Sequence, residues 1–127
     1  MEKKLLALLL AMFVLNASAQ EVMKREKDGT YIVNTTTLAQ DVDGYNGPTP
    51  VEVHIRKNKI VKVVVLKSQE GPKYVARVQK GMLPHYEGAS VKKGSVQHVD
   101  GVTGATFTSD AIRENVKRAV AYYWKHK

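Results

Sequence analysis

The sequence predicts a small α+β domain in which a small antiparallel sheet with a β-hairpin packs against two amphipathic helices. Three patterns support this fold class. Residues 51–56 alternate apolar and polar side chains with period two, as a half-buried strand does, and residues 60–66 form a second, valine-rich strand. Residues 73–83 repeat apolar side chains at helical spacing, and a longer stripe with the same period follows residue 109.

The segments before the hairpin carry weaker patterns. Residues 21–28 are charged and have no clear period, so we expect them to fray. Residues 29–33 form a short run of β-prone side chains, and residues 34–38 are either a polar loop or a continuation of that strand. Residues 43–48 are dense in turn-forming residues and lead directly into the hairpin.

Beyond the first hairpin strand, individual turn-forming and helix-breaking residues predict where each element ends. Lys57-Asn58 is expected to reverse the chain between the two hairpin strands. Pro72 favours the first turn of a helix, and Pro84 ends that helix. We expect a loop over residues 85–94, where glycines interrupt the pattern, and a short extended segment over residues 96–99.

The second helix is predicted to start just after a capping residue. Thr108 or Ser109 has the side chain of a good N-cap. The apolar stripe beyond it consists of Ile112, Val116, Ala119, Val120 and Tyr123. The charged side of the same helix carries Arg113, Lys117, Arg118 and Lys125. This pattern predicts a helix that packs one face on the sheet and leaves the other in solvent.

The N-terminus indicates export. Two lysines within residues 1–4, an apolar run over residues 5–15 and the small residues Ala17-Ser18-Ala19 form the pattern of a secretory signal peptide. The run is short for a bilayer span, so a membrane anchor is the weaker interpretation. We therefore expect the mature protein to begin at Gln20 and to be periplasmic or secreted, with membrane association as a further option.

Composition narrows the classes of partner and site. The chain has a formal charge of +8, and the part expected after cleavage keeps +7. Such a surface attracts anionic partners, among them phosphoflavin, acidic electron-transfer proteins and the envelope surface, although it is equally compatible with a merely solvated basic face. Nucleic acid is not expected, because no recognition motif is visible. The absence of cysteine rules out disulfides and thiolate sites, and the four histidines lack metal-ligand spacing.

One heptapeptide is the strongest candidate for a functional site in this sequence. The run from Asp100 to Thr106 has the pattern Asp-x-x-Thr-Gly-Ala-Thr and stands just before the second helix. Gly104 and Ala105 have minimal side chains, so another protein can approach the backbone closely. The Thr106 hydroxyl is a weak nucleophile without a recognisable base in this chain, and a helix N-terminus nearby favours a phosphate. The alternative is a simple turn ahead of a helix cap.

This motif resembles the acceptor sequence of the FMN-binding domain family, which includes periplasmic flavin subunits of sodium-pumping NADH:quinone oxidoreductase and of the Rnf complex. The resemblance implies that an FAD:protein FMN transferase takes FMN from FAD and links its phosphate to Thr106. Asp100 and Thr103 would belong to the pattern that the transferase recognises, although Asp100 also suits an Asx turn. Together with the N-terminal pattern, the resemblance gives the expected organisation: a signal peptide over residues 1–19, an N-terminal strand or linker over 20–42 and an FMN-binding domain over 43–127.

A second part of the resemblance lies ahead of the hairpin. The run Gly44-Tyr45-Asn46-Gly47 matches the Gly-Tyr-x-Gly turn with which the family's domain begins. Tyr45 is the candidate for lining the flavin ring, with Gly44 and Gly47 permitting backbone approach, whereas the alternative is a tyrosine that packs on the sheet. Residues 70–72 resemble, loosely, the family's loop that borders the flavin. Thr108 is counted with the cofactor-binding residues, although capping is its more common use, and Phe107 is expected in the core.

These observations favour an exported electron carrier with FMN held by a phosphoester on Thr106. Its partners would be the transferase and redox donor and acceptor proteins that the sequence does not identify. An electron-transfer protein is favoured over a free-standing enzyme, because no acid, base or metal constellation accompanies the motif. The alternatives are the flavin module of a multi-subunit periplasmic reductase, and a flavin-free module whose basic surface binds an anionic component of the membrane or envelope.

Overall fold

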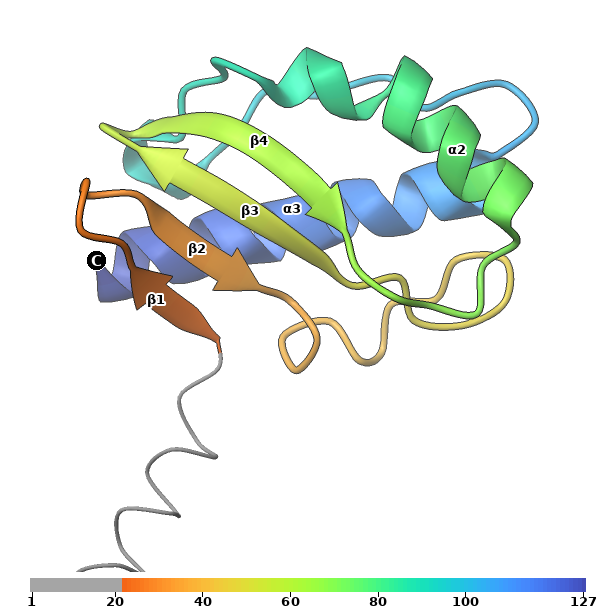
Figure 1. The fold of residues 1–127 in the computed structure, drawn as a ribbon, viewed down its shortest axis with the longest axis horizontal. Coiled ribbons are helices and arrows are strands. Elements are labelled where there is room, and N and C mark those ends of the chain that lie inside the picture. Colours follow the sequence, from red (N-terminus) through yellow and green to blue (C-terminus); the bar gives the residue numbers. More distant parts are fainter. Residues whose placement is uncertain (1–21) are drawn as a thin grey trace, which may run out of the picture.

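The computed structural model describes residues 22–127, and the predicted signal peptide lies outside the described residues. The described chain forms a four-stranded antiparallel sheet in the order β1-β2-β3-β4, with helices packed against it (Figure 1). The strands are β1 (Met23–Arg25), β2 (Tyr31–Asn34), β3 (Val51–Arg56) and β4 (Lys59–Val65). The helices are α2 (Pro72–Gly81) and α3 (Thr106–His126), with the 3-10 turns η1 (Leu83–Tyr86) and η2 (Lys92–Gly94) between them. This arrangement confirms the predicted α+β class.

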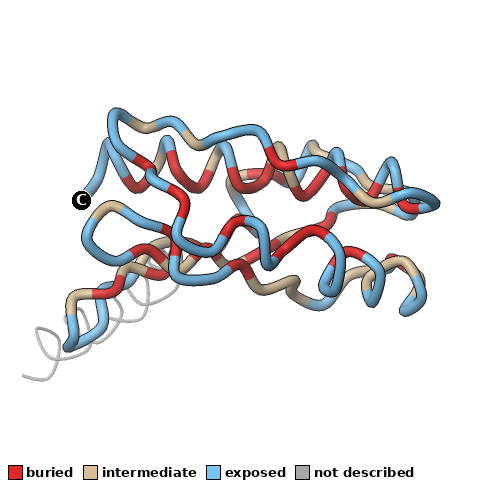
Figure 2. Tube along the Cα trace, turned by 90° about the horizontal axis from the view of Figure 1, so that it is seen from above, coloured by how far each residue is buried: buried red, intermediate tan, exposed pale blue. Residues whose placement is uncertain are grey.

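The core lies between the sheet and α3, which runs along one face of β2 and β3 (Figure 1). The alternation in β3 directs Val51, Val53 and Ile55 inward, and all three are fully buried. The predicted stripe of α3 is buried against them along its length. Figure 2 shows these buried positions recurring along the helix and the strands between exposed ones. Each such aliphatic side chain contributes about 1.5–3 kcal/mol through removal from water.

The hairpin forms as predicted, but the N-terminal segment differs from the prediction. Lys57 and Asn58 both have positive φ, 52° and 60°, as the tight turn of a twisted hairpin requires. The expectation that residues 21–28 fray was wrong for the described part of that range, since Met23–Arg25 pairs with β2 as a short edge strand. A three-residue edge strand owes its place to backbone hydrogen bonds, and its side chains need no apolar period.

The predicted loop over residues 85–94 contains η2 and the end of η1, and it covers an edge of the sheet. The N–H of Gly88 donates to the carbonyl of Ile60, and the N–H of Ile60 donates to the carbonyl of Ala89. These bonds satisfy part of the outer edge of β4, where exposed backbone groups would otherwise pair with another chain. No helix among residues 22–127 has the length and apolar content needed to span a bilayer.

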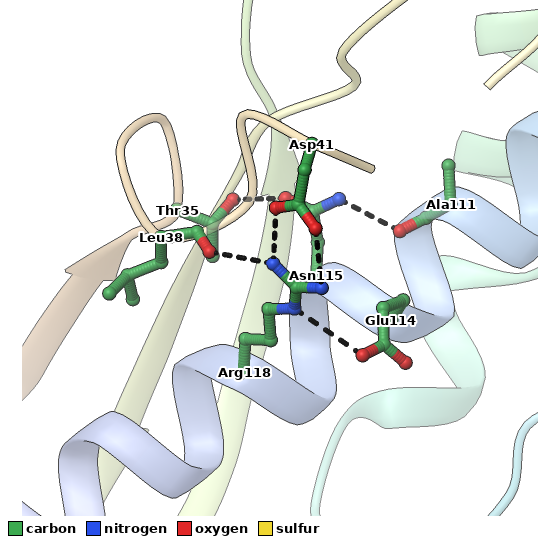
Figure 3. A network of polar contacts seen from close by, with 7 residues as sticks. All are labelled: Thr35, Leu38, Asp41, Ala111, Glu114, Asn115 and Arg118. Carbon is green, nitrogen blue, oxygen red and sulfur yellow. Dashed lines mark hydrogen bonds and ion pairs between the residues drawn. The ribbon is translucent and has the colours of Figure 1, made fainter. Parts of the chain in front are cut away.

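A polar network ties the segment after β2 to the middle of α3 (Figure 3). The buried Thr35 hydroxyl donates to Asn115 Oδ1 and accepts from the N–H of Val51. Arg118 donates to both carboxylate oxygens of Asp41, at 2.6 and 3.0 Å, and this hydrogen bonding holds the pKa of Asp41 below its ordinary value. The network therefore fixes the path of the chain as it approaches the Gly-Tyr-Asn-Gly turn.

Candidate functional site

The motif from Asp100 to Thr106 forms a loop pinned to both helices, and it ends where α3 begins. The N–H of Val102 donates to Ser109 Oγ at 3.1 Å, and Arg113 Nε donates to the carbonyl of Val99 at 2.9 Å. On the other side, Val102 packs so closely on α2 that a Cβ at Gly81 would lie 2.6 Å from its side chain. The loop is thus held on two sides and delivers its last residue, Thr106, to the solvent as the first residue of α3.

The predicted N-cap of this helix was wrong. α3 starts at Thr106, Ala105 occupies the N-cap position, and no side chain caps the helix. Thr108 and Ser109 are buried within the first turn, because their hydroxyls contact Glu70 and the motif loop instead of the helix end. The first backbone N–H groups of α3 therefore have no side-chain acceptor, and no acidic residue lies in the first turn. This leaves a helix end that favours an anion.

A guanidinium group stands beside this helix end. Gly104 has φ +86°, and a Cβ there would lie 2.1 Å from Arg77 Nη1, so only glycine admits the arginine in this position. Arg77 extends from α2 and donates to the carbonyl of Thr103 at 3.3 Å. Thr103 itself does not line the hollow described next. The motif loop therefore combines an exposed hydroxyl, an uncapped helix N-terminus and an adjacent cation.

Aromatic side chains surround the same hydroxyl. A hollow of about 260 Å³ is lined by Tyr45, Tyr74, Gly104, Ala105, Thr106, Phe107 and Thr108. The Tyr45 ring centroid lies 5.9 Å from that of Tyr74 and 6.2 Å from that of Phe107. Tyr45 and Phe107 are each 63% exposed, so the expectation of Phe107 in the core was wrong. Large apolar rings gathered at the surface are a common sign of a binding site.

The buried Glu70 side chain connects the parts of this site through hydrogen bonds. Its carboxylate is buried and accepts hydrogen bonds from the backbone N–H groups of Tyr45 and Asn46, at 2.8 and 2.9 Å. It also accepts from the hydroxyls of Thr49 and Thr108, each at 3.1 Å. The Glu70 carboxylate thus joins the Gly-Tyr-Asn-Gly turn to the first turn of α3. Because the Thr108 hydroxyl donates to this carboxylate, it does not cap the helix.

The two glycines of the turn have separate roles in holding Tyr45. A Cβ at Gly44 would lie 1.8 Å from Glu70 Oε1, so this position must be glycine for the carboxylate to approach. Gly47 has φ +123°, a conformation that side chains rarely adopt, and its carbonyl accepts from the N–H of Gly44. Both glycines allow the backbone conformation and contacts of the turn, and neither lines the hollow.

Asp100 lies apart from the aromatic rings. It borders a second hollow of about 310 Å³, which is lined by Gly81, His85, Gln97, His98, Val99, Asp100 and Gly101. The Asp100 side chain is 97% exposed, and its Oδ1 lies 3.3 Å from His98 Nε2. Within residues 22–127 its carboxylate accepts no backbone hydrogen bond, so the Asx turn is not formed. The same described residues contain no cluster of side chains suited to a metal ion.

The structure therefore brings the two sequence motifs to one place. Tyr45 from the turn and residues 104–106 from the motif loop share one hollow. Two additional members line it: Tyr74, which belongs to the apolar repeat of the helix predicted over residues 73–83, and Phe107, which was expected in the core. In the comparison with known proteins, the model of a family described as "FMN-binding domain" matches residues 44–121, a range that contains both motifs. No curated protein and no solved structure matched the chain.

Proposed function

We propose that this chain, which belongs to the FMN-binding domain family, is an exported flavoprotein that carries FMN on Thr106 and serves as an electron carrier. One observation carries the proposal. The Thr106 hydroxyl is exposed at an uncapped helix N-terminus, inside a hollow bordered by aromatic rings. An acceptor for a bulky phosphorylated ring needs both features.

The residues present fit such a group. The phosphate linked to Thr106 would lie by the first N–H groups of α3 and the Arg77 guanidinium, which are suited to a negative charge. Tyr45, Tyr74 and Phe107 offer ring faces and edges on which the flavin ring can pack. The small side chains at positions 104 and 105 leave the approach to the hydroxyl open.

Attachment needs a separate enzyme. The Thr106 hydroxyl has no hydrogen-bond partner in the described part of the chain, and so no internal base activates it. The proposed partner is a transferase that uses FAD. The Thr106 oxygen forms a bond to the phosphorus of the FMN half, the bond from that phosphorus to AMP breaks, and a base of the transferase takes the hydroxyl proton. Asp100, almost fully exposed beside the loop, is available for recognition by such an enzyme.

The attached FMN would supply one- and two-electron transfer. The protein's own part is to hold the ring and leave it reachable. The wide exposure of Tyr45 and Phe107 supports this, because a partner could approach the ring edge without a conformational change. The phosphoester suits a protein outside the cytoplasm, since a noncovalent site would empty when free FMN is scarce.

The test is the mass of the exported protein. We expect the protein, coexpressed with a flavin transferase in a host that exports it, to gain the mass of FMN less one water. Flavin absorbance should stay with the polypeptide after denaturation and gel filtration, and the tryptic peptide with Thr106 should carry it. Protein made without the transferase is the control. A coexpressed product with only the polypeptide mass would overturn the proposal.

The aromatic rings give a further prediction. Replacing Tyr45 by alanine should leave FMN attached but raise its fluorescence several-fold, because a phenol ring that packs on the flavin quenches its emission by donating an electron to the excited ring. Tyr74→Phe, which keeps the ring but removes the phenol hydroxyl, should act in the same direction. Val61→Ala, which truncates an exposed apolar side chain on β4 outside the hollow, is the matched control. Steady-state emission at equal flavin absorbance is the measurement, and unchanged emission in both ring variants would contradict this placement.

A further inference from the structure

The end of the molecule that holds the C-terminus carries a concentration of exposed cations. Three hairpin or loop segments meet there with the last turn of α3 (Figure 1). We call this surface the basic end. Its cations are Arg25, Lys27, Arg56, Lys57, Lys59, Lys92, Lys93, Lys125 and Lys127. All of them are exposed, and none forms an ion pair within residues 22–127.

Specific contacts hold these segments together. Asn58, in the β3–β4 turn, accepts hydrogen bonds from the Tyr123 hydroxyl at 2.7 Å and from Lys127 Nζ at 3.4 Å. The carbonyl of Asn58 accepts from the N–H of Val91, just before η2. The Tyr31 ring, at the start of β2, meets the Tyr123 ring edge-on at 5.2 Å. The segments that carry the cations are therefore held next to one another on one surface.

The two side-chain carboxylates of the β1–β2 turn lie near these cations, but they leave the charge of the surface strongly positive. Glu26 lies 3.9 Å from Lys24, a cation outside the set, and both side chains are well exposed. Asp28 accepts hydrogen bonds from Thr30, which together with the nearby charge of Arg56 lower the pKa of Asp28. Because the basic end has many more cations than carboxylates, its field favours a partner with spread negative charge.

An indole ring lies among these cations. Trp124 is 37% exposed, its side chain packs against Gly94, and Lys127 Nζ lies 3.9 Å from its ring centroid. Tyr122, one residue before it, stacks on His126 with ring centroids 4.1 Å apart. Trp and Tyr next to lysine are suited to the headgroup region of a bilayer, where one part of the side chain is apolar and the other is wet.

The basic end and the aromatic hollow lie at opposite ends of the same helix. α3 has 21 residues, so its first residue, Thr106, is about 30 Å from its last turn. A partner bound at the basic end would leave the hollow open. This separation argues for anchoring and against docking of the redox partner at the basic end, since electron transfer needs a partner near the flavin.

We propose that the basic end binds the surface of a bilayer that contains anionic phospholipids, with Trp124 entering the headgroup region. A lipid surface fits better than one acidic protein, because the cations are spread over separate turns and line neither of the two hollows, as suits a diffuse negative charge. The protein would then sit peripherally on the membrane with Thr106 pointing away from it. This inference goes beyond the proposed electron carriage and holds with or without flavin.

The test is binding of the exported, flavin-loaded protein to vesicles. We expect sedimentation with vesicles of phosphatidylcholine and phosphatidylglycerol, none with phosphatidylcholine alone, and weaker binding as salt rises. The chain has one tryptophan, so its emission reports on Trp124 alone. That emission should shift to the blue on anionic vesicles. A protein that stays in the supernatant with anionic vesicles at low salt would overturn the proposal.

Charge-reversal variants distinguish binding through the basic end from binding that depends only on the net charge of the protein. The triple variant Lys27→Glu, Lys92→Glu, Lys93→Glu should lower vesicle affinity by about tenfold or more. The matched control Lys67→Glu, Lys73→Glu, Lys117→Glu makes the same change in net charge at exposed sites elsewhere and should bind almost as well as the parent. Equal losses in the two variants would overturn the assignment to this end. Flavin content and thermal unfolding check that both variants are folded.

Discussion

Replacing Thr106 by valine should abolish covalent flavin while leaving the protein folded. Valine keeps the shape and the β-branch of threonine but has no hydroxyl oxygen to bond to phosphorus. Thr106 is exposed and makes no side-chain hydrogen bond within residues 22–127, so the free energy of unfolding should change by no more than about 0.5 kcal/mol. Intact mass and flavin absorbance after denaturation measure the first effect, and thermal unfolding measures the second.

Two further variants make this experiment specific. Thr106→Ser restores a hydroxyl at the same place and should restore attachment. Thr37→Val removes an exposed hydroxyl outside the motif and should leave the flavin content unchanged. If the Thr106→Val protein kept a full equivalent of covalent flavin, another residue would be the acceptor, and the proposed site would be wrong.

Helix α3 shows which parts of the site could be predicted from the sequence. The apolar stripe of α3 predicted its buried face correctly, and extending the stripe backward explains the two errors at its start. Thr108 is four residues before Ile112 and so continues the stripe, which makes it a buried residue and not a cap. Phe107 is five residues before Ile112, rotated by roughly 140° at about 100° per residue, and so points to solvent. The helical period therefore predicts a buried Thr108 and an exposed Phe107, whereas the polarity of the two side chains alone suggests the reverse.

The polar support of the site could not be predicted in the same way. Glu70 receives its hydrogen bonds from residues 21 to 38 positions away in the sequence. No local period connects the turn at residues 44–47 to the first turn of α3, so the sequence indicated only that residues 70–72 form a loop near the site. In the same way, β1 owes its place to backbone pairing with β2, which leaves little trace in its side chains.

Glu70→Ala should have the largest effect on stability of any single change near the site. The variant removes a buried carboxylate and leaves two backbone N–H groups and two hydroxyls without their acceptor. A buried donor without a partner costs about 1–3 kcal/mol, so we expect a loss of about 3 kcal/mol or more in the free energy of unfolding. Denaturant unfolding monitored by circular dichroism measures this loss.

The matched control is Glu52→Ala on β3. That carboxylate is partly exposed, and its contact is His54 at 3.3 Å, so its removal should cost no more than about 1 kcal/mol. Because Glu70 also ties Tyr45 to α3, its loss should free the aromatic turn. Any flavin that is still attached should then be more fluorescent than in the parent. If Glu70→Ala and Glu52→Ala lowered the free energy of unfolding equally and flavin emission did not change, Glu70 would not be the residue that positions the site.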